Sequence, residues 1–162
     1  MGIEIERKFL LASEDWRQET DNGVRIKQGY FNNTENFTLR VRTFNARAFL
    51  TIKGPSNGLT RSEYEYEIPL SDAQKMFQEF CGTRIVEKIR YKIPEANGVG
   101  VWEIDEYLGD NLGLFTAELE LPSEETTFVK PQWLGEEVTS IKRYSNGSLS
   151  RYPYTTWTME EK

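Results

Sequence analysis

Three charged residues close to the start of the chain have the types and the spacing that chemistry requires. Glu4, Glu6 and Lys8 are separated by two positions each. In a β-strand such residues point to the same side, so this segment predicts one face with two carboxylates and an ammonium group. Carboxylates are suited to hold a hard cation, and an ammonium group is suited to hold an anion. The opposite face carries mostly apolar residues, namely Ile3, Ile5, Arg7, Phe9 and Leu11.

The same alternation recurs in seven further segments. They are residues 25–31, 36–44, 48–53, 60–69, 84–93, 100–106 and 116–121. Alternation over runs of this length is typical of β-strands. Their charged sides contribute basic residues at Arg40, Arg42, Lys53, Arg61, Lys88, Arg90 and Lys92, and acidic residues at Glu63, Glu65, Glu67, Glu103, Asp105, Glu118 and Glu120.

One such strand alone would be typical of an antiparallel sheet with one face exposed to solvent. The whole set favours another arrangement, because few of these faces carry Ser, Thr or Asn. We predict a mainly β (α+β) fold in which the strands close into a barrel, the charged faces line one cavity, and helices cover the apolar outside. Gly- and Asn-containing connections at 45, 54–58, 97–98 and 109–111 read as hairpins. Helices are expected from Ser71, with Ala73, Met76, Phe77 and Phe80 on one side, and over residues 139–151.

Composition limits the classes of function. A chain of 162 residues predicts a single domain over 1–162, and the net charge of −6 argues against nonspecific nucleic-acid binding. Without an apolar run of membrane-spanning length or a leader peptide, we expect no membrane partner and a cytoplasmic location. The single Cys81, flanked by apolar residues, is expected in the core of a protein from a reducing compartment. The oligomeric state stays open, a homodimer included.

The chain contains no histidine. This excludes the Ser-His-Asp arrangement and histidine metal sites. A metal would therefore be a hard cation held by carboxylates, and Mg²⁺ or Mn²⁺ fits that set of ligands.

The N-terminal pattern Glu4-x-Glu6-x-Lys8 resembles the ExExK signature of the CYTH family, the triphosphate tunnel metalloenzymes. The resemblance continues in order along the chain through Leu39–Arg42, Thr51–Gly54, Glu63–Glu65, Glu87–Arg90, Trp102–Asp105 and Ala117–Glu120. Residues 138–146 resemble the family's C-terminal run, although Ser140-Ile141 replaces its usual Gly-Asp pair. The likeness to short bacterial members implies an eight-stranded antiparallel barrel forming a tunnel, and metal-dependent hydrolysis or rearrangement of a triphosphate.

If a triphosphate binds in such a tunnel, each charged group has an expected role. A linear polyanion needs cations along its length, and arginine can grip phosphate oxygens with two hydrogen bonds. We expect phosphate contacts from Lys8, Arg40, Arg42, Lys53, Lys88 and Arg90. We expect metal ligands at Glu4, Glu6, Glu118 and Glu120, and an acid that orients the attacking water among Glu63, Glu65 and Asp105. Lys8, beside the acids, would bridge them to the terminal phosphate.

The leading hypothesis is an inorganic triphosphatase that releases orthophosphate from tripolyphosphate. Alternatives on the same fold are a class IV adenylate cyclase, a thiamine-triphosphatase and a nucleoside triphosphatase. Short loops leave little material for a nucleobase pocket and favour a compact substrate. A non-catalytic polyphosphate-binding module would gain nothing from the paired Glu118 and Glu120, and a lipocalin-like carrier would need an apolar interior.

Overall fold

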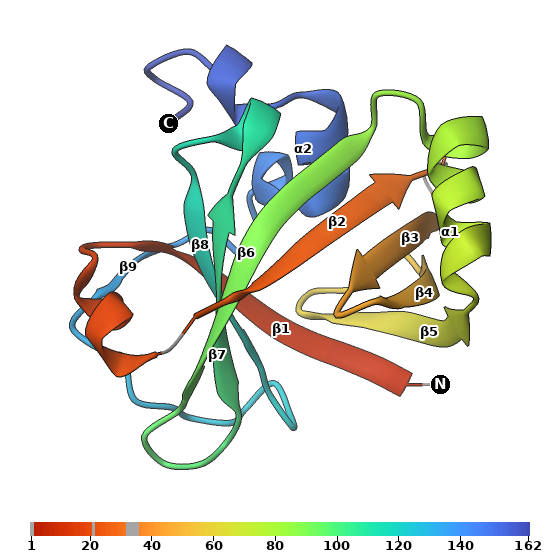
Figure 1. Ribbon diagram of the computed structural model, residues 1–162. Helices are drawn as coiled ribbons and strands as arrows, with labels where there is room; N and C mark the ends of the chain where they lie inside the picture. Colours follow the sequence, from red (N-terminus) through yellow and green to blue (C-terminus); the bar gives the residue numbers. More distant parts are fainter. Residues whose placement is uncertain (1, 21, 32–35) are drawn as a thin grey trace.

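The computed structural model describes residues 2–20, 22–31 and 36–162 and contains one highly curved sheet (Figure 1). Its strands are β1 (Gly2–Leu11), β2 (Val24–Tyr30), β3 (Thr38–Phe44), β4 (Arg47–Lys53), β5 (Thr60–Ile68), β6 (Ile85–Pro94), β7 (Val101–Tyr107), β8 (Phe115–Glu120) and β9 (Leu134–Glu137). The α-helices are α1 (Leu70–Met76) and α2 (Asn146–Arg151). Short 3₁₀ turns lie at Asp15–Glu19, Gly109–Asn111, Lys142–Tyr144 and Tyr154–Thr156.

The first eight strands close into an antiparallel barrel, as the sequence predicts. The order is β5-β4-β3-β2-β6-β7-β8-β1-β9, and an additional β5–β1 pairing closes the ring. The start of β1 pairs with β5, from Gly2 opposite Glu63 to Ile5 opposite Thr60. Further along, β1 pairs with β9, with Phe9 opposite Glu137. The ninth strand was not predicted, since Leu134–Glu137 is too short to show a clear alternation.

The apolar outer faces of the strands pack under a cover that is only partly helical. Outside β1, β7 and β8, the cover comes from the 3₁₀ turn with Trp16 and from the long connection with Phe128 and Trp133. Both tryptophans are buried, and Trp133 packs edge-on against Trp102 of β7, with ring centroids 5.7 Å apart. These two connections therefore cover an apolar outer face on which we expected helices.

Helix α1 covers the opposite side of the barrel, at β3 and β4 (Figure 1). It continues into a π-helical turn at Phe77–Cys81, which buries Cys81 and leaves Phe80 half exposed. Cys81 is thus a core residue, as predicted, whereas Phe80 lies outside the core because the wider turn changes the helical spacing. Close packing needs Gly29, since a Cβ there would lie 2.6 Å from the Cys81 sulfur.

The predicted helix over 139–151 is wrong in its extent and place. Only Asn146–Arg151 forms α2, because Ser145 is extended (φ −67°, ψ 146°) and caps the helix by accepting a hydrogen bond from the Ser148 amide. Instead of covering the outside, α2 lies across one end of the barrel. There Asn146 accepts a hydrogen bond from Lys88 of β6, at 3.1 Å, so the C-terminal segment contributes to the interior.

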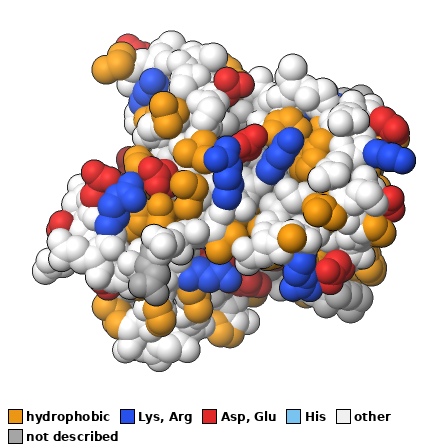
Figure 2. All heavy atoms as spheres, in the orientation of Figure 1, with side chains coloured by type: hydrophobic (Ala, Val, Ile, Leu, Met, Phe, Trp, Pro, Cys, Tyr) orange, Lys and Arg blue, Asp and Glu red, His pale blue; other side chains and the backbone are white. Residues whose placement is uncertain are grey.

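The outer surface mixes side chains of all kinds. On the face in Figure 2, acidic, basic and apolar groups are interspersed. Among the described residues, no helix has the length and apolar character needed to cross a bilayer. Acidic and basic side chains are separated from each other inside the barrel, where they line the cavity.

Stability should depend on the outer apolar faces. Ile104 of β7 is fully buried, so Ile104→Ala should lower the free energy of unfolding by about 2–5 kcal/mol through the cavity it leaves. Ile52 of β4 is 37% exposed, and Ile52→Ala should cost less than about 1 kcal/mol. Urea unfolding of both variants measures the difference. Equal losses would contradict the difference in burial between these two outward side chains.

Candidate active site

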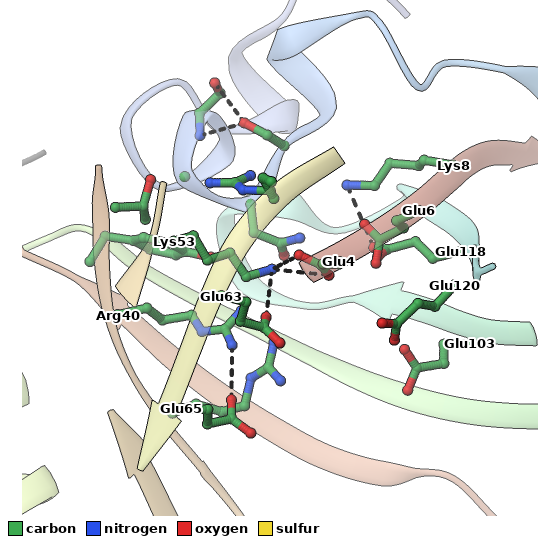
Figure 3. Close-up of a pocket in the computed structure, with 18 of the residues that line it drawn as sticks. Glu4, Glu6, Lys8, Arg40, Lys53, Glu63, Glu65, Glu103, Glu118 and Glu120 are labelled. Atoms are coloured by element: carbon green, nitrogen blue, oxygen red, sulfur yellow. Dashed lines mark hydrogen bonds and ion pairs between the residues drawn. The ribbon is translucent and has the colours of Figure 1, made fainter. Parts of the chain in front are cut away.

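The strand order divides the barrel interior into a basic half and an acidic half. Figure 3 shows Arg40 and Lys53 on one side of the cavity and Glu6, Glu103, Glu118 and Glu120 on the other. The strands β4, β3 and β6, with β2 between the last two, bring in the basic side chains Lys53, Arg40, Arg42, Lys88 and Arg90. The strands β7, β8, β1 and β5 are also neighbours and bring in Glu103, Glu118, Glu120, Glu4, Glu6, Glu63 and Glu65, together with Lys8 and Arg61. Together these side chains line a cavity of about 320 Å³.

Carboxylates crowd one another in the acidic half. The strand register sets Glu6 opposite Glu120 and sets Glu118 opposite both Lys8 and Glu103. Like charges opposite one another destabilise a sheet. Burial and the charges of Glu118 and Glu4 hold the pKa of Glu6 well above its usual range. Burial would also raise the pKa of Glu118, but Lys8, a hydrogen bond with Glu6, and Arg90 hold it well below its usual range.

Lysine and arginine neutralise the acids nearest to the basic half. Lys53 lies 3.0 Å from Glu4 Oε2 and 3.3 Å from Glu63 Oε2, so one ammonium group serves two carboxylates (Figure 3). Arg40 lies 3.5 Å from Glu65. These pairs bring together residues predicted to bind phosphate with residues predicted to bind metal or orient water.

Asp105 does not line the cavity. Its side chain is fully buried, receives two hydrogen bonds from Arg90 at 2.8 and 2.9 Å, and lies 2.8 Å from Lys88 Nζ. The prediction that Asp105 orients the attacking water is therefore corrected: both of its oxygens are engaged with bases, and it can act only by holding them. The other twelve predicted site residues all line the cavity.

Lys8 and Lys88 connect the cavity to the C-terminal segment. Lys8 lies 3.5 Å from Glu118 and donates a hydrogen bond to the Tyr144 carbonyl at 3.0 Å. Lys88 donates to Asn146, which also accepts from Tyr107. Burial, followed by the charges of Arg90 and Arg42, lowers the pKa of Lys88 to about 7 despite the opposing effect of Asp105.

Arg42 carries a charge that the barrel does not neutralise directly. Its Nε donates to Gln28 at 3.0 Å, but no ion pair joins it to a carboxylate in the described part of the chain. Burial and the nearby charges of Arg40 and Arg90 lower its pKa to about 10. An anion in the cavity would relieve this repulsion.

Several lining residues had no predicted role. Arg61 and Glu103 follow the strand alternation, so the pattern placed them on the charged faces without showing that they reach the cavity. Tyr30, Asn146 and Ser148 also line it. Nothing in the sequence points to Asn146 and Ser148, because their position depends on how α2 lies across the barrel end.

The acidic half fits a divalent cation that is shared with an anion. Among the described residues no three acidic side chains converge closely enough to hold a metal by themselves. One buried oxygen each of Glu4 and Glu118 accepts no hydrogen bond, and its neighbouring charge is an ammonium group, Lys53 at 3.0 Å or Lys8 at 3.5 Å. Mg²⁺ usually takes one or two carboxylates and completes its shell with water and substrate phosphates. The residues therefore fit such a cation, with the remaining ligands supplied by a phosphate compound between the two halves.

Comparison with known proteins agrees with this geometry. The family model of the CYTH domain matches residues 2–154. An inorganic triphosphatase of Acetivibrio thermocellus is 44% identical over 154 residues, covering 95% of this chain and 97% of the relative. An inorganic triphosphatase of Nitrosomonas europaea is 37% identical over 152 residues, covering 91% and 96%.

Solved structures show the same architecture. The crystal structure of the inorganic triphosphatase NE1496 superposes with a TM-score of 0.67 at 35% identity, covering 93% of this chain and 95% of that one. The PH1012 protein from Pyrococcus horikoshii OT3 superposes with a TM-score of 0.59 at 22% identity, covering 75% and 79%, which is a likeness of fold alone. With the matched segment spanning all eight strands of the charged barrel, the chain belongs to the CYTH domain family.

Proposed function

We propose that this protein is an inorganic triphosphatase, which hydrolyses tripolyphosphate inside the barrel and releases orthophosphate. One observation carries the proposal: a basic half and an acidic half face each other across one cavity. A polyanion alone would be repelled by the acids, and a cation alone would be repelled by the bases. A polyphosphate with a divalent metal satisfies both halves. The two inorganic triphosphatases that align over nearly the whole chain support the same substrate class.

The basic half holds the phosphate chain in this proposal. Arg40, Arg42 and Arg90 come from two different strands and offer planar groups that can bind phosphate oxygens with two hydrogen bonds each. Lys53 and Lys88 add charge along the cavity, and Lys8 reaches the terminal phosphate from the acidic side. Phosphoryl transfer depends mainly on positioning and on stabilising charge on the equatorial oxygens, and these groups supply both.

The acidic half holds the metal, for which we propose Mg²⁺ or Mn²⁺. Glu6 and Glu118 would be its ligands, with Glu4 and Glu120 beside them on the same two strands. When bound, the ion would polarise the phosphoryl group and acidify a water molecule. An inorganic triphosphatase of this type is a phosphoric anhydride hydrolase that depends on a divalent metal.

Glu63 and Glu65 are the acids that can orient the attacking water. Each lines the cavity and is held by one base, Lys53 or Arg40, so an oxygen of each carboxylate can face a water molecule. Asp105 is a positioning residue. It aligns Arg90 through two hydrogen bonds and keeps Lys88 next to it in the cavity wall.

The substrate is tested by comparing tripolyphosphate, pyrophosphate, ATP and thiamine triphosphate with either metal. We expect tripolyphosphate to have the highest kcat/KM, because the site obtains its binding energy from phosphate contacts. EDTA should abolish turnover, and added Mg²⁺ or Mn²⁺ should restore it. A higher kcat/KM for ATP, or cyclic AMP as the main product in chromatography, would contradict the proposal. Binding of tripolyphosphate without any turnover would instead indicate a polyphosphate-binding module.

The metal site is tested with Glu6→Gln. Removing one charge from the crowded carboxylates should raise the Tm of the metal-free protein, since repulsion between Glu6, Glu118 and Glu120 is relieved. Mg²⁺ added with a triphosphate whose bridging oxygens are replaced by NH should raise the Tm of the wild type by mass action. The variant should lose most of the increment that depends on Mg²⁺ and most of its activity.

Glu136→Gln is the matched control, because Glu136 is exposed on β9 and does not line the cavity. Scanning calorimetry with and without Mg²⁺ gives both effects. If Glu6→Gln and Glu136→Gln behave alike, the metal does not bind at Glu6.

A further inference from the structure

The C-terminal segment meets two lysines of the phosphate-binding cavity at the start of α2. Lys8 donates a hydrogen bond to the Tyr144 carbonyl at 3.0 Å, and Lys88 donates one to Asn146 at 3.1 Å. Both lysines line the cavity. The C-terminal segment itself contributes Ser145, Asn146, Gly147, Ser148 and Arg151 to the same lining. Asn146 therefore lies where this segment borders the bases that we assign to the phosphate chain.

Apolar packing fixes the backbone on both sides of Asn146. Tyr144 comes two residues before it and Leu149 three residues after it, and both are buried in one apolar cluster with Tyr107 and Trp157. The Cα position of Asn146 is therefore set by the core, before any substrate is bound.

The chemistry of its neighbours decides which way the Asn146 amide is turned. Its Oδ1 accepts hydrogen bonds from Lys88 Nζ and from the Tyr107 hydroxyl, each at 3.1 Å. An ammonium group can only donate, so the amide atom that faces Lys88 has to be the oxygen. The Nδ2 group, which carries two N–H donors, is then turned away from this lysine.

The Nδ2 group of Asn146 donates no hydrogen bond to another group in the described part of the chain. Polar groups close to it are already engaged. Both oxygens of Asp105 are held by bases, and the hydroxyls of Ser145 and Ser148 bond to each other at 2.9 Å. An acceptor for this donor has therefore to come from the contents of the cavity.

We propose that Asn146 contacts the substrate: its Nδ2 group donates a hydrogen bond to an oxygen of the phosphate next to Lys8 and Lys88, while its Oδ1 holds the Lys88 ammonium in place. The inference rests on the proposed function and adds a neutral donor to the bases that hold the phosphate chain. A neutral amide suits this place, because Arg42 and Arg90 already repel Lys88 and another cation would add to the repulsion. Since the amide is aligned in advance, little side-chain freedom is lost when the hydrogen bond forms.

Nuclear magnetic resonance of the wild type tests the contact without turnover. In a proton–nitrogen correlation spectrum, the side-chain amide pair of Asn146 is the pair that is missing in Asn146→Asp or Asn146→Ala. Mg²⁺ with the NH-bridged triphosphate should move one proton of this pair downfield, because a hydrogen bond to a charged oxygen is short and strong. The pair of Asn57, which is exposed in the connection between β4 and β5 and does not line the cavity, should stay in place. An unmoved Asn146 pair in protein that has bound the triphosphate would overturn the proposal.

Variants measure how much the contact contributes to binding. Asn146→Asp keeps an acceptor for Lys88 and Tyr107 and replaces the donor by a negative charge, whereas Asn146→Ala removes the donor without adding a charge. Calorimetry should show the NH-bridged triphosphate binding at least about tenfold more weakly to both, because a hydrogen bond to a charged group is lost. Asn57→Asp is the matched control and should bind within about twofold of the wild type.

The Tm of metal-free Asn146→Asp should stay within about 3 °C of the wild type, since its neighbours keep their acceptor. Wild-type affinity in Asn146→Ala, or an equal loss of affinity in Asn57→Asp, would overturn the proposal. If the wild type binds the triphosphate but does not hydrolyse tripolyphosphate, the proposed function fails, and the shift of the Asn146 amide pair still decides the contact.

Discussion

The repulsion among the carboxylates of β1, β7 and β8 is the constraint on which the rest of the structure depends. Glu6 of β1 lies opposite Glu120 of the adjacent strand β8, and Glu118 of β8 lies opposite Glu103 of β7. Lys8 is the base that approaches Glu118, at 3.5 Å. Buried like charges cost stability unless they are paired or bind a cation. A divalent metal bound with a phosphate chain, as proposed, would relieve the repulsion on both walls of the cavity at once.

Apolar packing on the outside of the barrel offsets the loss of stability that the buried charges cause. Tryptophan, phenylalanine and aliphatic side chains pack around β1, β7 and β8, on the faces opposite the crowded acids. A second apolar cluster joins α1 and its π-helical turn to β3 and β4, behind the arginines. Since residues of a strand alternate between the two sides, each buried apolar side chain fixes the position of a charged neighbour. The geometry of the site is therefore set by packing that never touches a substrate.

The strand alternation was sufficient to predict the strands and the charged faces that line the cavity, because a period of two is a local property of the sequence. The closed eight-stranded barrel was implied by the resemblance to the CYTH family. Three features depend on contacts between distant segments and could not be predicted in this way. Asp105 follows the alternation, yet Lys88 and Arg90 cover it. Residues 139–151 look helical in part, but the extended Ser145 shortens the helix and places Asn146 at Lys88. The covering loops with Trp16 and Trp133 show no periodic pattern at all.

The division of the interior into halves is tested most directly by crystallography of the protein with Mn²⁺ and an NH-bridged triphosphate. Anomalous scattering locates the manganese independently of the protein. The account predicts manganese bonded to carboxylates of β1 and β8, with phosphates between that ion and the arginines of β3 and β6. Manganese bound only outside the barrel, or phosphates that contact no residue of the basic half, would contradict it.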